Sequence, residues 1–142
     1  MPPRFAVIDT NVFINGLISN QSESPPCQIV DAMLRGNFLF LLSVDLLAEY
    51  RTVLLRPKIK KLHGLKEEEI DTILTEITAN GIVKDPQTVP PQGLDPKDQH
   101  VWDLLRCHPN AILITGDQAL RKMALKHFTA LTSHEFVEQV LS

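Results

Sequence analysis

Short, unbroken apolar segments alternate along this chain with segments of helical periodicity. The apolar segments span residues 5–8, 38–42 and 111–115, and shorter ones occur at 82–84 and 128–131. An unbroken run of strand-favouring residues is typical of a strand buried on both faces, as in a parallel sheet. The alternation therefore predicts βαβ units. The fold class we expect is α/β, a three-layer sandwich with a central, mainly parallel sheet flanked by helices.

The segments between the strands repeat apolar residues at helical spacing. We expect helices over 27–35, 45–55, 67–78, 118–127 and 133–141, and a further helix that opens at Asp95 and Pro96. Gly36 and Gly81 are expected to end the helices that precede them. A capping box from Thr132 to Glu135 starts the last helix. The proline-rich residues 85–95 are predicted to form an irregular surface loop.

The length of the chain suits one ordinary domain, so we expect residues 1–142 to form a single domain. Its longest apolar runs are far shorter than the roughly 20 residues that cross a bilayer, which predicts no membrane segment. The first strand is not preceded by the pattern of a secretory signal, so we expect a cytoplasmic protein. The two cysteines, Cys27 and Cys107, form neither a disulfide framework nor the paired spacing of a zinc site.

The net charge leaves the class of partner open. The chain has 14 Lys and Arg against 17 Asp and Glu, a formal charge of −3. This balance alone disfavours an electrostatic nucleic-acid binder. Two divalent cations bound by acidic residues would more than offset that charge, so it weighs little against a phosphate-bearing substrate.

Two aspartates follow predicted strands. Asp9 comes directly after residues 5–8, and Asp117 follows residues 111–115 with Gly116 between. The carboxyl ends of parallel strands meet at one edge of a sheet, where ligands usually bind, so we expect both aspartates at that edge. Each also has a local alternative. Asp9 suits an Asx turn or a helix cap, and Asp117 suits the N-cap of the next helix.

Glu49 lies on or beside the apolar face of its predicted helix. Leu46 precedes it by three positions and Val53 follows it by four. A solvated glutamate would prefer the opposite face. The alternative is a glutamate at the boundary of the apolar stripe whose carboxylate points outward, toward Arg51 or Arg56.

Asp98 also leans toward the core side of its predicted helix, because Val101 and Trp102 follow it by three and four positions. Its alternative is an acid that caps its own helix or compensates the helix dipole. Asp103 is expected instead to face solvent and to pair weakly with Arg106.

A compact α/β fold could bring Asp9, Glu49, Asp98 and Asp117 into one pocket. Four neighbouring carboxylates do not stay ionised without cations. Oxygen donors without His or Cys at metal spacing favour Mg²⁺ or Mn²⁺ over Zn²⁺. Carboxylate-bound Mg²⁺ commonly activates water and polarises phosphoryl oxygens, so the chemistry we expect is phosphodiester hydrolysis without a side-chain nucleophile.

Four segments, in their order and spacing, resemble the PIN-domain nucleases, in particular the small single-domain members that act as toxins of bacterial and archaeal toxin–antitoxin pairs. These segments are 7–13 (VIDTNVF), 47–50 (LAEY) before Arg56 and Pro57, 95–98 (DPKD) and 113–117 (LITGD), and the likeness covers nearly the whole chain. The resemblance implies an Mg²⁺- or Mn²⁺-dependent endoribonuclease. It also implies which residues are catalytic and bind the metal, namely Asp9, Glu49, Asp98 and Asp117.

The same resemblance implies roles for polar neighbours and for partners. Asn11 and Thr115 would orient carboxylates or metal-bound water, and turn or strand-end hydrogen bonding are the alternatives. The partners implied are an RNA substrate, a cognate antitoxin protein whose segment covers the acidic pocket, and a second copy of the chain in a homodimer.

The densest run of basic residues comprises Arg51, Arg56, Lys58, Lys60 and Lys61. We expect Arg51, Arg56 and Lys58 to contact the RNA backbone beside the acids. The alternative is a solvated surface loop. His100 is expected to be solvated, although its position near Asp98 would allow it to border the site.

Two other functions stay open at this stage. A PIN-like scaffold that no longer cleaves would keep the fold and act as a protein-interaction module. A Mg²⁺-binding phospho-receiver also places acids at strand ends, but it needs a tight acid pair after the first strand and a lysine on a late strand. Asp9 stands alone in this chain, and Lys84 is poorly placed for the second role.

Overall fold

Parallel strands form the centre of the computed structural model, which describes residues 4–87 and 96–141. The main sheet has the order β1-β4-β5, with β1 at Phe5–Ile8, β4 at Ala111–Ile114 and β5 at Thr129–Leu131. All pairings are parallel, and Ile8 is level with Ile114, which is level with Leu131. The expected strands 5–8, 111–115 and 128–131 are therefore confirmed.

A second pair of strands extends this sheet. β2 (Leu41–Leu42) pairs in parallel with β3 (Ile82–Val83), and a bridge between Ala6 and Phe40 joins the pair to β1. The strand predicted over 38–42 is shorter than expected, because only its last two residues pair regularly.

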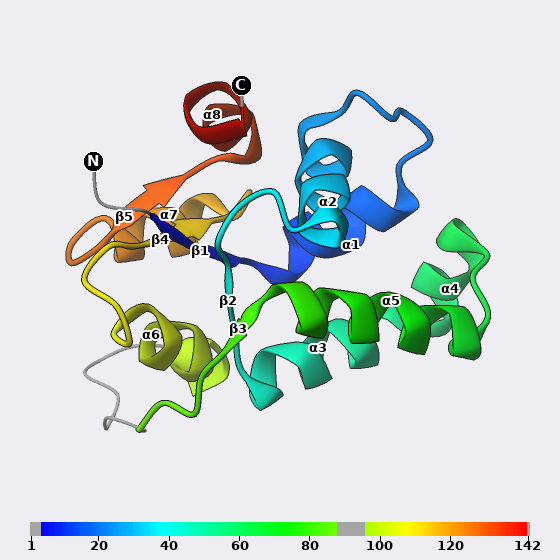
Figure 1. Ribbon diagram of the computed structural model, residues 1–142, viewed down its shortest axis with the longest axis horizontal. Helices are drawn as coiled ribbons and strands as arrows, with labels where there is room; N and C mark the ends of the chain where they lie inside the picture. The colour runs from blue at the N-terminus through cyan, green and yellow to red at the C-terminus, as the bar shows by residue number, and fades with distance from the viewer. Residues whose placement is uncertain (1–3, 88–95, 142) are drawn as a thin grey trace.

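Helices flank the sheet, with α6 below it and α8 above it in the view of Figure 1. The structure is thus the α/β sandwich that the sequence predicts. In chain order the helices are α1 (Thr10–Ile18), α2 (Pro25–Arg35), α3 (Val44–Leu54), α4 (Pro57–His63), α5 (Glu67–Asn80), the 3-10 turn η1 (Pro96–Asp98), α6 (Gln99–Leu105), α7 (Gln118–Ala124), α8 (Ser133–Phe136) and the π-helical turn η2 (Val137–Leu141). The helices predicted over 27–35, 45–55, 67–78 and 118–127 are confirmed within three residues at either end. The helix predicted over 133–141 is α-helical only to Phe136 and continues as the π-helical turn η2 to Leu141. The predicted cap Asp95 lies outside the described residues.

Helix α1 is absent from the sequence-based prediction. Its residues include β-branched side chains, asparagine and glycine, which have low helix propensity. The carboxylate of Asp9 accepts a hydrogen bond from the Thr10 amide at the N-terminus of the helix. Val12, Phe13 and Ile14 are buried, so packing overrides the weak local preference.

Helix α4 carries much of the basic run for which a solvated loop was one interpretation. Pro57 occupies the first turn, and Gly64 ends the helix with φ of 65°, a conformation that glycine adopts without strain. A proline at the start and a glycine at the end of a segment are typical of a helix between them, so Pro57 and Gly64 indicate α4 in the sequence.

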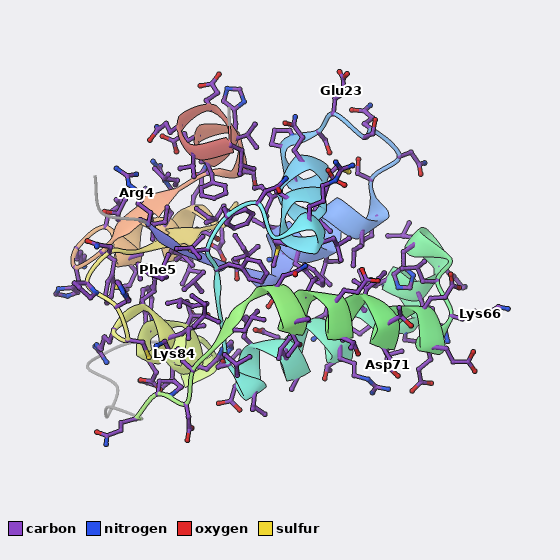
Figure 2. All side chains as sticks on the ribbon, in the orientation of Figure 1. Arg4, Phe5, Glu23, Lys66, Asp71 and Lys84 are labelled. Carbon is purple, nitrogen blue, oxygen red and sulfur yellow. The ribbon has the colours of Figure 1, made fainter. Side chains whose placement is uncertain are left out.

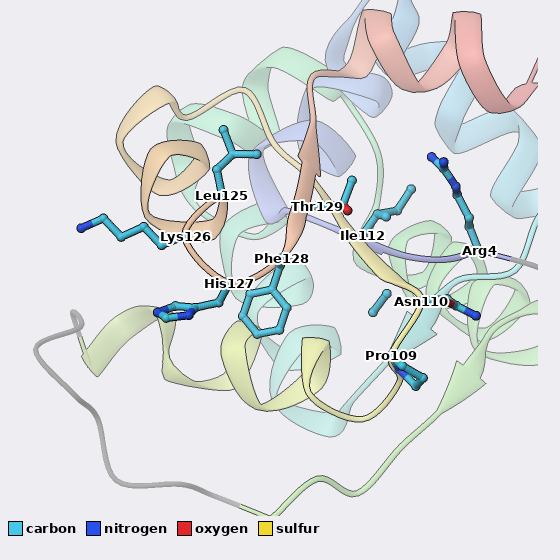
Figure 3. Close-up of a pocket in the computed structure, with 10 residues that line it drawn as sticks. Arg4, Pro109, Asn110, Ile112, Leu125, Lys126, His127, Phe128 and Thr129 are labelled. Carbon is cyan, nitrogen blue, oxygen red and sulfur yellow. The ribbon is translucent and has the colours of Figure 1, made fainter.

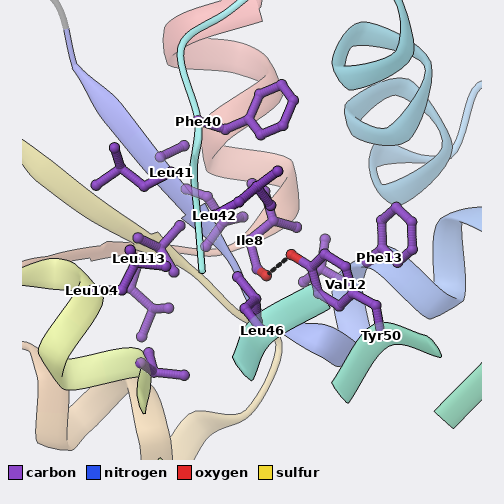
Figure 4. Packing of buried hydrophobic residues seen from close by; sticks show 14 of the residues in the cluster. Ile8, Val12, Phe13, Phe40, Leu41, Leu42, Leu46, Tyr50, Leu104 and Leu113 are labelled. Carbon is purple, nitrogen blue, oxygen red and sulfur yellow. Dashed lines mark hydrogen bonds between the residues drawn. The ribbon is translucent and has the colours of Figure 1, made fainter. Parts of the chain in front are cut away.

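The core lies between the sheet and the surrounding helices. Phe13 of α1 stacks on Tyr50 of α3 with ring centroids 4.3 Å apart, and the Tyr50 hydroxyl donates a hydrogen bond to the Ile8 carbonyl (Figure 4). Tyr50 and Trp102 are both buried. These contacts hold α1 and α3 against the carboxyl end of β1. No helix in residues 4–87 or 96–141 has the length and hydrophobicity that crossing a membrane requires.

Candidate active site

Asp9 lies immediately after β1, at the carboxyl edge of the sheet. Its backbone amide donates to the Ile114 carbonyl at 2.9 Å, which ties the end of β1 to the end of β4. Its Oδ1 accepts a hydrogen bond from the Thr10 amide at 2.9 Å, and its Oδ2 accepts one from the Thr115 hydroxyl at 2.8 Å. The helix-cap alternative for Asp9 is thus correct, and it fixes the direction of the carboxylate.

Thr115 and Asp117 follow β4 at the same edge. Thr115 is fully buried, and its hydroxyl accepts a hydrogen bond from the Asp117 amide at 3.0 Å while it donates to Asp9. The exposed Asp117 is the N-cap of α7, because its Oδ1 accepts from the Leu120 amide at 3.1 Å. Thr115 therefore links the two aspartates that the parallel strands bring together.

Glu49 reaches the same region from α3. Its Oε2 accepts a hydrogen bond from the Thr10 hydroxyl at 2.8 Å and lies 3.0 Å from His100 Nε2. The interpretation that this carboxylate points toward Arg51 or Arg56 is wrong for Arg51, which pairs with acids of α5 instead. The helix presents Glu49 to α1 and α6 because the adjacent Tyr50 is packed into the core.

Thr10 is a site residue that the sequence pattern did not indicate, and for His100 the alternative, that it borders the site, is the correct one. The expectation that His100 is solvated is wrong, since its side chain is only 18% exposed and contacts Glu49. The only feature of the sequence that pointed to Thr10 as a site residue is its position directly after Asp9. Nothing in the pattern of α6 indicates that His100 faces α3, because that depends on how the two helices pack.

Asp98 is the N-cap of α6 and lies two residues before His100, half-buried at the start of that helix. Asn11 is exposed in the first turn of α1. Within the described part of the chain, Asn11 takes no part in the hydrogen bonds that hold Asp9 and Glu49. The structure thus brings Asp9, Glu49 and Asp117 together and places Asp98 on the helix that contacts Glu49.

The pKa of Asp9 is affected by its burial and by the neighbouring acids. Burial raises the pKa of Asp9 above its ordinary value, and the negative charges of Glu49 and Asp117 raise it further. Hydrogen bonds from Thr115 and Thr10 act in the opposite direction. Burial also raises the pKa of Tyr50 far above its ordinary value, so its phenol stays neutral and serves as a donor to β1.

The donor set suits a hard divalent cation. Partly buried carboxylates that repel one another are stabilised by positive charge, and Mg²⁺ and Mn²⁺ prefer oxygen ligands. Residues 4–87 and 96–141 contain no group of three or more His, Cys, Asp or Glu side chains arranged to hold a metal. Mg²⁺ is often bound by only one or two carboxylates, with water and substrate phosphates as further ligands. The residues present therefore fit an open cation site.

Asp103 contradicts its predicted exposure. It is 5% exposed and accepts a hydrogen bond from Gln99 Nε2 at 2.7 Å, while Arg106 is 4.0 Å away. All five residues from Val101 to Leu105 are buried, so α6 is covered on more than one face and has no fully solvated side at this position. A helical pattern with a single apolar face does not describe such a helix.

The three predicted RNA contacts differ in their surroundings. The Arg51 guanidinium pairs with Glu67 at 2.6 Å and with Asp71 at 2.9 Å, and Asp71 is labelled on α5 in Figure 2. Arg56 and Lys58 are exposed at the start of α4, and neither has an ion pair within the described residues. Arg56 and Lys58 therefore present free charge to solvent, whereas the charge of Arg51 is offset.

A separate cavity of about 480 Å³ lies at the opposite end of the sheet (Figure 3). It is bordered by Ala111 and Thr129, the first residues of β4 and β5, and by Arg4 before β1. None of the four candidate acids borders it. Ligands of parallel sheets usually bind at the carboxyl ends of the strands, so this cavity is not the site that the acids form.

Comparison with known protein families adds an independent finding. The family model for the PIN domain matches residues 6–119. The matched region includes β1 from its second residue on, all of β4 and the four candidate acids. No curated protein sequence matches the chain.

Proposed function

The chain belongs to the PIN-domain family, whose members are generally nucleases that use divalent metal ions, and we propose that it is an Mg²⁺- or Mn²⁺-dependent endoribonuclease. The observation that carries this proposal is the convergence of Asp9, Glu49 and Asp117 at the carboxyl edge of the sheet, where burial, together with the charges of Glu49 and Asp117, raises the pKa of Asp9. Such a grouping destabilises the folded state without a cation, so a binding role accounts for its presence better than a structural one.

The residues that would hold the cation are Asp9, Glu49, Asp98 and Asp117. When bound, a divalent ion polarises a phosphoryl oxygen, lowers the pKa of attacking water and stabilises the leaving oxygen. Thr115 keeps Oδ2 of Asp9 in a fixed direction and holds the backbone of Asp117.

The exposed Arg56 and Lys58 are our candidates for binding the phosphate backbone of the RNA. Hydrolysis of this kind needs no covalent bond between the enzyme and the substrate.

We further propose that the protein is the toxin of a toxin–antitoxin pair and forms a homodimer. The support is the likeness of four sequence segments to the small single-domain toxins of this family. Asp117 is exposed and the Glu49 side chain is 41% exposed, so the acidic edge is open to a covering segment of an antitoxin.

A second candidate function is a PIN-like scaffold that binds other proteins without cleaving RNA. The observation that favours it is the lack of a closed group of three or more metal-ligating side chains within residues 4–87 and 96–141. A phospho-receiver has less support, because Asp9 is followed by the buried Thr10 rather than by a second acid.

Cleavage of a panel of structured RNAs and single-stranded DNA by the purified chain tests the proposal. We expect Mn²⁺ or Mg²⁺ to be required, and the Asp98→Asn variant to lose at least about 100-fold in rate. Asp31→Asn is the matched control, since Asp31 forms an exposed ion pair with Arg35 on α2. Circular dichroism checks that both variants fold.

Full activity in Asp98→Asn, or after chelation of divalent ions, would contradict the proposed site. Failure of the wild-type protein to cut any substrate in the panel would contradict the nuclease function and favour the scaffold.

A further inference from the structure

Two hydrogen-bond donors from different helices converge on one oxygen of Glu49. The Thr10 hydroxyl on α1 lies 2.8 Å from Oε2, and His100 Nε2 on α6 lies 3.0 Å from the same atom. Glu49 itself belongs to α3. Three helices that are distant in sequence therefore meet at a single carboxylate oxygen.

Both donors are more buried than the glutamate that they contact. Thr10 is 5% exposed, and its backbone amide is bonded to Asp9 at the start of α1. The His100 side chain is 18% exposed, whereas that of Glu49 is 41% exposed. A half-exposed glutamate in a helix can adopt several rotamers, so two fixed donors select one of them.

The environment of the His100 ring indicates which nitrogen carries its proton. A carboxylate oxygen only accepts, so the contact with Glu49 requires hydrogen on Nε2. Nδ1 is buried and has no hydrogen-bond partner among the described residues. A proton on Nδ1 would be left without an acceptor, which disfavours it. Hydrogen on Nε2 satisfies both observations.

The other oxygen of Glu49 is left available. Oε1 accepts no hydrogen bond within residues 4–87 and 96–141, while Oε2 accepts two. A carboxylate held by one oxygen presents the second in a fixed direction, which is how the neighbours of metal ligands raise the affinity of a site.

We propose that His100 and Thr10 are positioning residues for Glu49, which hold Oε2 and leave Oε1 free to bind a divalent cation. This inference rests on the proposed metal-dependent function. It adds two residues that act through Glu49 and do not themselves contact the cation.

The tautomer of His100 gives a readout that needs neither metal nor substrate. In ¹⁵N-correlated NMR spectra of the metal-free full chain at mildly alkaline pH, we expect His100 to show protonated Nε2 and unprotonated Nδ1. Glu49→Ala removes the acceptor and should shift the His100 ring resonances toward those of a mixture of tautomers. An unchanged His100 signal in Glu49→Ala would overturn the proposed contact.

Mn²⁺ affinity, measured by electron paramagnetic resonance titration, tests the effect on the site. We expect His100→Leu and Thr10→Val to weaken Mn²⁺ binding by about 10- to 100-fold. His100→Gln and Thr10→Ser are the matched controls, because each keeps a donor near the original position and should bind within a few-fold of wild type. Cleavage assays should show the same ranking in kcat, with KM for RNA little changed.

The outcomes separate this inference from the function on which it rests. If the wild-type protein binds Mn²⁺ and cuts RNA, and His100→Leu and Thr10→Val do the same with equal affinity, the positioning role is wrong and the nuclease function stands. If the Mn²⁺ affinity of His100→Gln falls as far as that of His100→Leu while both variants fold, His100 acts by packing alone and its positioning role is wrong. If the wild-type protein neither binds Mn²⁺ nor cuts RNA, both proposals are wrong.

Discussion

The hydroxyl of Thr115 donates a hydrogen bond of 2.8 Å to Oδ2 of Asp9, across 106 positions of the sequence. Thr115 is fully buried after β4, and Asp9 follows the neighbouring strand β1. The same hydroxyl accepts a hydrogen bond from the Asp117 amide. One buried side chain thus orients the carboxylate of one candidate ligand and the backbone of another.

Replacement of Thr115 by valine keeps the shape of the side chain and removes both hydrogen bonds. We expect Thr115→Val to lower the free energy of unfolding by about 1–3 kcal/mol, because the Asp9 carboxylate and the Asp117 amide each lose the hydrogen bond to the buried Thr115 hydroxyl. Cleavage should fall by at least about tenfold. Thr115→Ser keeps the hydroxyl and is the control. Urea unfolding and RNA cleavage measure both effects, and equal results for the two variants would show that the hydroxyl contributes to neither.

The crossing of α1 and α2 depends on the absence of a side chain at Gly16. A Cβ at this position would lie 2.4 Å from Val30 Cγ2 and 2.5 Å from the Pro26 carbonyl oxygen. The Pro26 oxygen is backbone, so it moves only if the helix moves. We expect Gly16→Ala to lower the free energy of unfolding by about 1–3 kcal/mol in chemical denaturation.

Gly116→Ala is the comparison for Gly16→Ala, because a Cβ at Gly116 would have no neighbour within 4 Å. Its free energy of unfolding should stay within about 0.5 kcal/mol of wild type. Equal stability of the two variants would show that α1 and α2 can separate at little cost.

The raised pKa of Asp9 predicts a stability that decreases with pH over a defined window. In metal-free protein, folded Asp9 binds its proton more tightly than unfolded Asp9, whose pKa is near 3.8. Between these two pKa values the folded state carries more protons, so the free energy of unfolding falls as pH rises. Once the pH exceeds the folded pKa, the full cost of the buried charge is present.

Asp9→Asn removes this titration. We expect the variant to gain stability relative to wild type as the pH rises through that window, and to lose cleavage activity, as is common where a functional site is electrostatically strained. Thermal unfolding at several pH values with a chelator present measures the difference. A constant difference between Asp9→Asn and wild type at every pH would contradict the raised pKa.

Arg56 and Lys58 should contribute to RNA affinity through phosphate contacts. Neutralising both, in Arg56→Gln with Lys58→Gln, should make the log–log dependence of RNA affinity on salt concentration less steep by about 1.4 to 1.8 units, roughly 0.7 to 0.9 for each phosphate contact. Arg51→Gln is the matched control, because the charge of Arg51 is already offset by Glu67 and Asp71. The slope is measured from the binding of labelled RNA at several salt concentrations, with every protein also carrying Asp98→Asn so that the RNA is not cleaved. A larger change of slope in Arg51→Gln than in the double variant would show that Arg51, and not Arg56 and Lys58, contacts the phosphates.

The two central strands, and the edge of the sheet at which the site forms, can be predicted from the sequence alone. Unbroken apolar runs identify β1 and β4 because both faces of a central parallel strand are covered. Parallel strands end at one edge, so the positions of Asp9 and Asp117 follow from their place after those strands. The ends of α2 and α5 follow from local cap chemistry, since Gly36 and Gly81 stand where the helical patterns stop.

Which helical side chains meet at that edge depends on how the helices pack and does not follow from the sequence pattern. Helix α1 forms because Phe13 and its neighbours are buried, although its residues have weak helix propensity. Asp103 is buried and His100 contacts Glu49 because α6 is covered on several faces, which periodicity within one helix does not reveal. The direction in which a side chain leaves its helix is set by the local backbone. Whether that side chain then meets solvent or another charge depends on which distant parts of the chain pack against the helix.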